Sequence, residues 1–169
     1  MLSFIETDFG NHVNELSVLT MKQQISSFLI DDSRDARNQF FLAFDLLQVS
    51  KACICFDDVD HAAAFCTAQP DTPDYIFLRV QQPAEDGKRM LDQLRQIPSL
   101  ENTPVIFYAA AFTPEDMTRM KSLGAADWLV KSSDLHQLKN CLHTMLEAFE
   151  RRQTAVPPVP EGALSPVLV

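Results

Sequence analysis

The fold is decided by a stretch in the middle of the chain, Pro73-Asp74-Tyr75-Ile76-Phe77-Leu78-Arg79-Val80-Gln81-Gln82-Pro83-Ala84-Glu85-Asp86-Gly87. Its run Tyr75 to Leu78 has strand length and is apolar without alternation, which is typical of a strand buried on both faces. Apolar residues at helical spacing follow it and predict one face of a helix: Met90, Leu91, Leu94 and Ile97. A buried strand followed by an amphipathic helix is therefore predicted, with Arg79 at the end of the strand.

The same alternation extends outward in both directions. Four further apolar runs have strand length: Ser27 to Ile30, Ala52 to Phe56, Val105 to Ala109 and Asp127 to Val130. Five strands are thus predicted, each buried on both faces. Two more helical faces are predicted between and after them, one by Ala36, Phe40, Phe44 and Leu47, the other by Leu135, Leu138, Leu142, Met145 and Phe149.

Capping signals agree with this order of elements. Ser33 stands where a side chain can cap the first helix. The sequence Thr113-Pro114-Glu115-Asp116 supplies a cap, a first-turn proline and an acidic third residue for a later helix. Gly124 follows Leu123 where a helix should stop.

Strands that alternate with helices predict an α/β fold, a doubly wound parallel sheet with helices on both faces. Five strands favour the flavodoxin-like order 2-1-3-4-5. We expect this domain to span residues 25–152. Residues 1–24 have no clear period and are expected to form an N-terminal extension, in which either Met1 or Met21 is the start of translation. Residues 153–169 are rich in proline and are expected to form a disordered tail.

Composition narrows the class of partner. The chain has 169 residues, is 46% hydrophobic and carries a net charge of −9. This acidity argues against binding to nucleic acid or to an anionic membrane, since both need clustered Lys and Arg. No run of 18 apolar residues could span a bilayer, and the N-terminus does not resemble a secretory signal. We expect a cytoplasmic protein whose partners are proteins.

The four cysteines sit inside apolar stretches: Cys53, Cys55, Cys66 and Cys141. They are expected to be buried as small hydrophobic residues, because disulfides are rare in a reducing compartment. Their spacing does not match a zinc site, so no metal is expected there.

Polar residues mark the predicted strand ends. Asp31 and Asp32 follow the first strand, Arg79 ends the third, Ala109 ends the fourth and Lys131 follows the fifth. The carboxyl ends of parallel strands meet at one edge of the sheet, where ligands bind in such folds. We therefore expect these five residues to converge there.

Four segments resemble the receiver domains of bacterial two-component response regulators, the CheY-like family: Ile30 to Ser33, Asp74 to Gly87, Thr103 to Ala110 and Gly124 to Lys131. The resemblance covers roughly residues 26–150. It implies a pocket in which an acidic pair and a third-strand aspartate hold magnesium, and in which that aspartate takes a phosphoryl group from a histidine kinase. Asp31 and Asp32 match the acidic pair, Lys131 the phosphoryl-binding lysine, and Trp128 the aromatic that changes rotamer.

Three positions depart from the family pattern. Arg79 stands at the phospho-acceptor, Ala109 replaces a hydroxyl residue, and Ser132 replaces a proline. A guanidinium among the ligands repels a metal ion, so no cofactor is expected and magnesium binding should be weak or absent. We hypothesise that Arg79 takes the place of the metal between Asp31 and Asp32; the alternative is that Arg79 points into solvent. Without a hydroxyl at Ala109, a fixed packing role is favoured for Trp128.

The sequence thus predicts a degenerate receiver: a stand-alone signalling module of a two-component pathway that is not phosphorylated and acts by binding a protein. A histidine kinase or another response regulator is the expected partner. Two alternatives stay open, a homodimeric scaffold formed through the fourth helix, fifth strand and fifth helix, and a conventional switch phosphorylated on another carboxylate such as Asp57 or Asp58. An enzyme is not expected, because the chain lacks a GxGxxG motif and has only four glycines.

Overall fold

The computed structural model describes residues 24–69, 71–82 and 85–154. Strands and helices alternate along this part of the chain: β1 (Ile25–Ile30), α1 (Arg34–Leu47), β2 (Ser50–Phe56), α2 (Val59–Ala68), β3 (Tyr75–Arg79), α3 (Asp86–Arg95), a 3-10 turn η1 (Pro98–Leu100), β4 (Val105–Ala109), α4 (Pro114–Leu123), β5 (Asp127–Val130) and α5 (Leu135–Thr154). Residues 1–23 of the predicted extension (1–24) and residues 155–169 of the predicted tail (153–169) lie outside the described residues. Helix α5 ends at Thr154.

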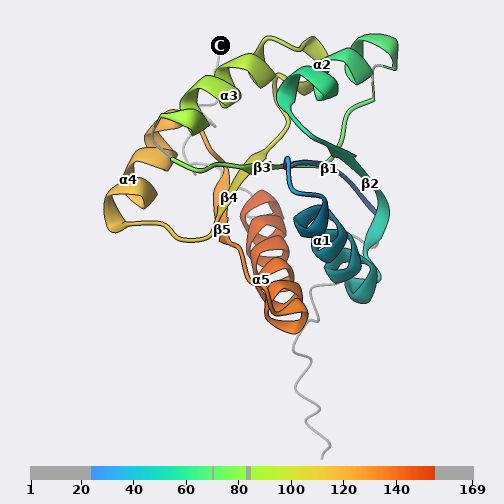
Figure 1. Ribbon diagram of the computed structural model, residues 1–169, viewed down its shortest axis with the longest axis vertical. Helices are drawn as coiled ribbons and strands as arrows, with labels where there is room; N and C mark the ends of the chain where they lie inside the picture. Colours follow the sequence, from blue (N-terminus) through green and yellow to red (C-terminus); the bar gives the residue numbers. More distant parts are fainter. Residues whose placement is uncertain (1–23, 70, 83–84, 155–169) are drawn as a thin grey trace, which may run out of the picture.

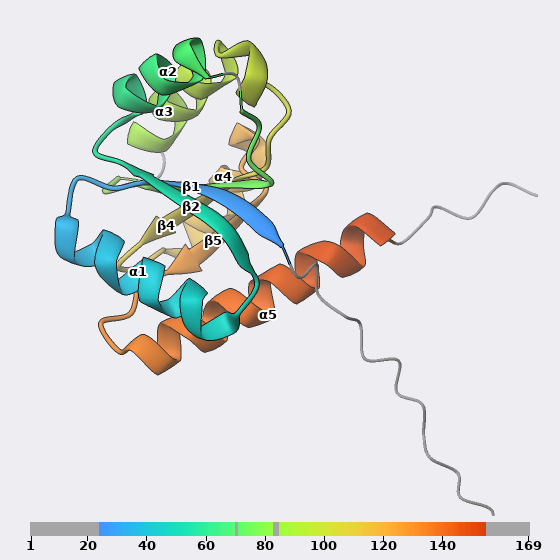
Figure 2. The ribbon, with the colours of Figure 1, turned by 90° about the vertical axis from the view of Figure 1, so that its right-hand side faces the viewer.

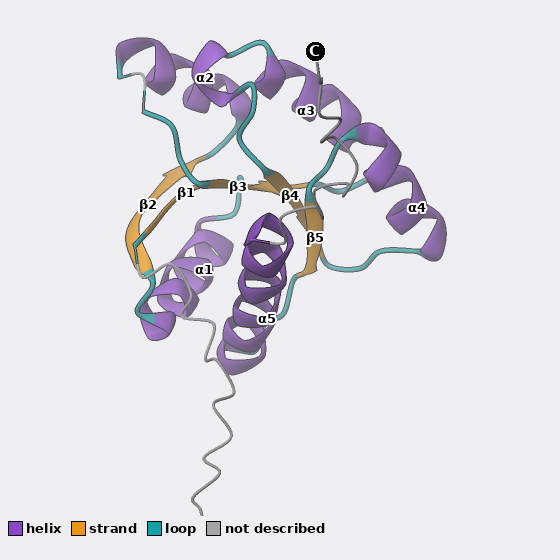
Figure 3. Ribbon diagram, turned by 180° about the vertical axis from the view of Figure 1, so that it is seen from behind, coloured by secondary structure: helices purple, strands orange, loops and turns teal. Residues whose placement is uncertain are grey.

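The five strands form one sheet in the order β2-β1-β3-β4-β5, and every neighbouring pair is parallel. Helices α1 and α5 cover one face, while α2, α3 and α4 cover the other (Figure 1). The view from behind shows the same three layers (Figure 3). The predicted α/β class, strand order and two-sided covering are therefore confirmed.

Two apolar clusters fill the space between these layers. On the α2, α3 and α4 side the buried residues include Phe28, Leu94 and Phe107. On the α1 and α5 side, Phe40 and Phe44 pack edge-to-face against Phe77, with ring centroids 4.7 and 5.5 Å from it. Alternate residues of the central strands point into opposite clusters, which is why these strands read as continuous apolar runs.

The edge strands differ from the prediction. In β2 the side chains of Lys51, Ala52 and Cys55 are exposed, because β1 is the one strand that pairs with it among the described residues and the helices cover it incompletely. Burial on both faces holds for β1, β3 and β4 and was wrong for both edge strands, since in β5 Asp127 and Trp128 are half-buried and Val130 is 47% exposed. The cysteines follow the same division: Cys66 is buried, Cys53 and Cys141 are half-buried, and Cys55 is exposed. The expectation that all four are buried was therefore wrong for Cys55.

The predicted caps are confirmed. The Ser33 hydroxyl accepts a hydrogen bond from the Ala36 N–H at the start of α1. Thr113 and Asp116 form a reciprocal capping box at the start of α4. Helix α4 ends at Leu123 and is capped by Gly124, whose φ of 95° lies in the left-handed region. Helix α2 was not assigned a face from the sequence; Asp58 caps it, and its N-terminal turn lies next to the end of β2. Figure 2 shows α5 continuing past the sheet at its C-terminal end.

Gly124 offers a test of this backbone geometry. Replacing Gly124 by Ala should lower the free energy of unfolding by about 1–2 kcal/mol, because a Cβ disfavours a positive φ. Gln48 ends α1 with a φ of 54° and is the matched control. Replacing Gln48 by Gly should leave stability unchanged or raise it, by up to about 1 kcal/mol. Urea denaturation measures both, and equal losses in the two variants would contradict the assignment.

Candidate functional site

The carboxyl ends of β1, β3 and β5 bring charged side chains together at one edge of the sheet. Asp31 and Asp32 directly follow β1, Arg79 is the last residue of β3, and Lys131 directly follows β5. The Lys131 N–H donates to the Ala109 carbonyl, so the β4–β5 pairing continues one residue past β5. This hydrogen bond holds the backbone of Lys131 in place at the sheet edge. Ion pairs link Arg79 to both aspartates and Lys131 to Asp31.

Asp31 is the centre of this cluster. Only 1% of its surface is exposed, yet its carboxylate has polar neighbours on every side. One oxygen, Oδ1, accepts from the Ser33 N–H at 2.8 Å and lies 3.7 Å from Nε of Arg79. The other oxygen, Oδ2, accepts from the Tyr108 hydroxyl and lies 3.7 Å from Nζ of Lys131. A buried carboxylate is tolerated only with such compensation, and this one has two cations and two hydrogen-bond donors.

Arg79 joins the two aspartates. Its Nη1 donates to Oδ1 of Asp32 while its Nε faces Asp31. The Arg79 side chain is 28% exposed and the Asp32 side chain is 65% exposed. The guanidinium of Arg79 therefore connects the buried carboxylate of Asp31 to the exposed carboxylate of Asp32. Two carboxylates beside one guanidinium and one ammonium have no net charge.

Tyr108 was not identified from the sequence. It lies on β4 and is 1% exposed, and its hydroxyl reaches across to Asp31. Burial raises the pKa of Tyr108, and the hydrogen bond to Asp31 raises it further, so the phenol stays protonated and donates. The sequence did carry a signal for this contact. A tyrosine one residue before the end of a buried strand has a hydroxyl that needs a hydrogen-bond partner.

The remaining predicted residues lie around this cluster. Ala109 is buried at the end of β4, and its methyl group cannot donate a hydrogen bond. Nζ of Lys131 lies 5.6 Å from the centroid of the Tyr108 ring. Trp128 is half-buried on β5, packs against the α2, α3 and α4 side of the core and has Nζ of Lys121 at 5.6 Å from its ring centroid. The structure thus brings Asp31, Asp32, Arg79 and Lys131 into contact and leaves Trp128 outside that contact.

A cavity of about 340 Å³ is lined by the C-terminal ends of β1 and β3, the segments after β1, β2 and β3, and the first half of α3: Ile30, Asp31, Asp32, Asp57, Asp58, Arg79, Gln81, Asp86, Arg89 and Met90. The two aspartates after β2 are both engaged. Asp57 pairs with Arg37 of α1. Asp58 accepts from the His61 N–H, which lowers the pKa of Asp58 and caps α2.

The pocket does not suit the magnesium ion that its acidic pair suggests. Magnesium requires oxygen ligands in near-octahedral geometry, and Arg79 places a cation where a third carboxylate would stand. Within residues 24–69, 71–82 and 85–154, no group of three or more His, Cys, Asp or Glu side chains is arranged to hold a metal ion.

No helix among these described residues is long and apolar enough to cross a membrane.

Removing Arg79 should expose how much the cluster depends on it. We expect Arg79→Ala to lower the free energy of unfolding by about 1–2 kcal/mol, because a buried carboxylate loses a charged neighbour. Arg89→Ala is the matched control, since Arg89 lines the same cavity but is exposed and donates only a long hydrogen bond to Gln93. Chemical denaturation compares the two, and an unchanged midpoint for Arg79→Ala would show that Arg79 has no structural role.

Comparisons with known proteins agree with this geometry. A family model described as "Response regulator receiver domain" matches residues 28–143. A Vibrio cholerae protein named "Probable cyclic di-GMP phosphodiesterase" is 32% identical over 74 residues, 44% of this chain and 17% of that protein. The transcriptional activator protein IrlR of Burkholderia pseudomallei is 33% identical over 89 residues, 53% of this chain and 38% of that protein. The chain thus matches less than half the length of these curated relatives.

A solved structure shows the same fold. The chemotaxis response regulator CheY4 of Vibrio cholerae superposes with a TM-score of 0.57 at 23% identity, covering 72% of this chain and 98% of that one. At this identity the likeness concerns the fold alone. The match to the family model is independent of this structural likeness. It spans more than two thirds of the chain and includes the strand ends that form the pocket. The chain therefore belongs to the response regulator receiver domain family.

Proposed function

We propose that this chain is a receiver-type signalling module that works without phosphorylation, by binding another protein of a two-component pathway. The observation that carries the proposal is the position of Arg79, whose guanidinium lies between the carboxylates of Asp31 and Asp32. In the family pattern an aspartate at this position accepts the phosphoryl group. A guanidinium stays protonated at physiological pH and cannot act as that nucleophile.

The surrounding groups support the same conclusion. Asp31 is buried and already bound by Tyr108, Ser33 and two cations, so it is not available to attack a phosphodonor. Ala109 offers no hydroxyl to a phosphoryl oxygen. With its charges balanced internally, the cluster favours a single arrangement of the strand ends over one that changes with an added ion.

A conventional switch that uses another carboxylate is less well supported. Asp57 and Asp58 line the cavity, but Asp57 is paired with Arg37 and Asp58 caps α2. Phosphorylation of either one would first have to break that contact. We propose no catalytic role for the chain, a cytoplasmic location, and a function that involves neither nucleic acid nor a membrane.

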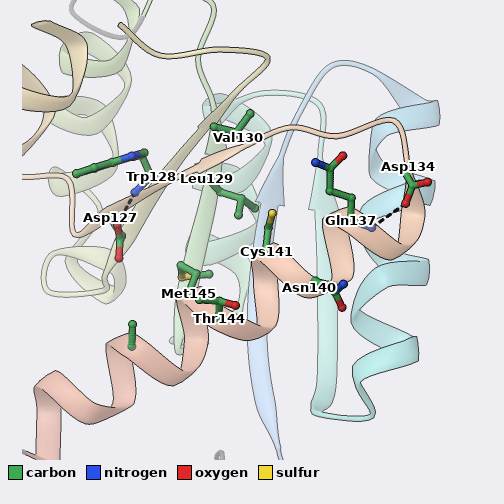
Figure 4. Close-up of a pocket in the computed structure, with 11 residues that line it drawn as sticks. Asp127, Trp128, Leu129, Val130, Asp134, Gln137, Asn140, Cys141, Thr144 and Met145 are labelled. Atoms are coloured by element: carbon green, nitrogen blue, oxygen red, sulfur yellow. Dashed lines mark hydrogen bonds between the residues drawn. The ribbon is translucent and has the colours of Figure 1, made fainter. Parts of the chain in front are cut away.

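The partner surface that we favour is the α4–β5–α5 face. A groove of about 790 Å³ runs there between β5 and α5, with Asp127 and Asp134 at its two ends (Figure 4). Leu129, Cys141 and Met145 are among its lining residues, and Val130, which also lines it, is 47% exposed. Asp127 is already paired with Arg152, so Asp134 supplies the available acidic charge, and such a groove suits a partner that offers apolar side chains next to a basic one. A histidine kinase or another response regulator is the class we propose.

Phosphorylation is tested by restoring the missing group. The native protein should gain no mass when incubated with magnesium and a small phosphodonor, and its Trp128 fluorescence should not change. Arg79→Asp should bind magnesium, because three carboxylates then face one another. Arg79→Asn, which removes the cation without adding a carboxylate, is the control and should bind it more weakly. A phosphoryl gain in the native protein, mapped to any carboxylate, would overturn the proposal.

The homodimer is tested by sedimentation. We expect the protein to remain a monomer as its concentration rises, because the groove is proposed to take a different protein. Val130→Lys should then leave the sedimentation coefficient unchanged. A concentration-dependent dimer that Val130→Lys abolishes, while Leu46→Lys on the exposed side of α1 does not, would favour the scaffold instead.

A further inference from the structure

The groove between β5 and α5 has the dimensions of a site for one extended chain segment. One wall consists of all four residues of β5, and the other of residues at helical spacing on α5, among them Gln137, Cys141, Met145 and Ala148 (Figure 4). From Asp134, directly before α5, to Ala148 this wall is about 21 Å long, at a rise of 1.5 Å per residue. An extended segment of about six or seven residues covers that length.

The groove offers apolar contacts along its middle and little charge. Leu129 and Met145 are buried at its inner side, while Cys141 is half-buried and Val130 is exposed. At the end nearest to the C-terminus of α5, Nη2 of Arg152 donates to Oδ2 of Asp127 at 2.5 Å and so offsets its charge. The groove therefore suits an uncharged, apolar segment over most of its length.

The chain itself leaves α5 beside this groove. Helix α5 ends at Thr154, two residues after Arg152. Pro157 and Pro158 follow in the sequence and cannot continue the helix, so the chain has to depart from the axis of α5 there. Ala148, at the near end of the groove, is about 9 Å back along the helix from Thr154. Residues 155–162 are eight in number and reach at most about 26 Å, which is enough to return to the groove.

The segment that follows matches the groove in length and in character. Residues 163–169 read Ala-Leu-Ser-Pro-Val-Leu-Val, in which five of the seven are apolar and none is charged. Glu161 is the single charged residue between 155 and 169. Segments that stay solvated are instead poor in apolar residues and rich in charge. Seven uncharged, mainly apolar residues thus follow a connection that is long enough to bring them to a groove of their own length.

We propose that residues 163–169 occupy the β5–α5 groove of their own chain and that a partner protein has to displace them. This inference rests on the proposed function of the groove as the partner surface. Its connection to α5 holds the segment at an effective concentration on the order of millimolar, so a weak apolar contact is sufficient for occupancy. The segment has no cation for Asp134, whereas the proposed partner does. The partner therefore gains a contact at Asp134 that the segment does not make.

The thiol of Cys141 reports whether the groove is occupied. The full-length protein and its Leu164→Ser/Leu168→Ser variant are treated with iodoacetamide at one pH, and alkylation of each cysteine is followed by peptide mass. We expect Cys141 to react several-fold faster in the variant, because the segment loses the side chains that hold it over the thiol. Both substitutions are uncharged and lie outside the described residues, so they leave the charges around Cys141 unchanged.

Two controls accompany this measurement. Ala155→Ser/Val156→Ser also makes two apolar residues polar, but they are at most about 7 Å beyond Thr154 and too close to it to enter the groove. That variant should keep the native rate at Cys141. Cys66 is buried in α2 on the opposite face of the sheet and should react equally slowly in all three proteins, which shows that the fold is intact.

Three results would overturn the proposal. The first is an equal Cys141 rate in the native protein and in Leu164→Ser/Leu168→Ser. The second is a rise in the Cys66 rate that parallels the rise at Cys141, since this would show general unfolding in place of a vacated groove. The third is protection of Cys141 only at concentrations where sedimentation detects a dimer, since the segment would then come from a second copy. Incubation with a phosphodonor tests the proposed function separately, so either proposal can fail while the other stands.

Discussion

The buried carboxylate of Asp31 is the group on which the arrangement of the strand ends depends. A charge removed from water must be compensated by neighbouring donors and cations. Here that compensation comes from four places: the first turn before α1 through Ser33, β4 through Tyr108, β3 through Arg79 and the end of β5 through Lys131. A single carboxylate therefore links every strand end in the central and β5 part of the sheet.

This linkage is the physical basis of the proposal that the module works without phosphorylation. In a receiver with an aspartate on β3, the pocket holds an excess of negative charge that an added ion and a phosphoryl group can change. Arg79 and Lys131 offset the charges of Asp31 and Asp32 without an added ion. This balance supports the proposal that the module signals through surfaces that bind other proteins and not through phosphorylation.

Much of the fold could be predicted from the sequence, because buried central strands and amphipathic helices leave strong periodic patterns. The caps at Ser33, Thr113 and Gly124 were predictable for the same reason, since each depends on a few neighbouring residues. The exposure of β2 was not, because which strand lies at an edge is set by tertiary packing. Tyr108 and the Arg37–Asp57 pair were missed since each joins residues far apart in the chain. The convergence of the charged residues followed from topology, while the way in which Arg79 pairs with them required coordinates.

The central claim is that Arg79 and Asp31 are energetically coupled, and a double-mutant cycle measures this directly. The free energies of unfolding of the native protein, Arg79→Ala, Asp31→Asn and the double variant are compared by urea denaturation at one pH and salt concentration. The account predicts a coupling of about 1–3 kcal/mol, with the double variant less destabilised than the sum of the two single variants. Strictly additive losses would mean that Arg79 does not compensate Asp31 and would contradict the account.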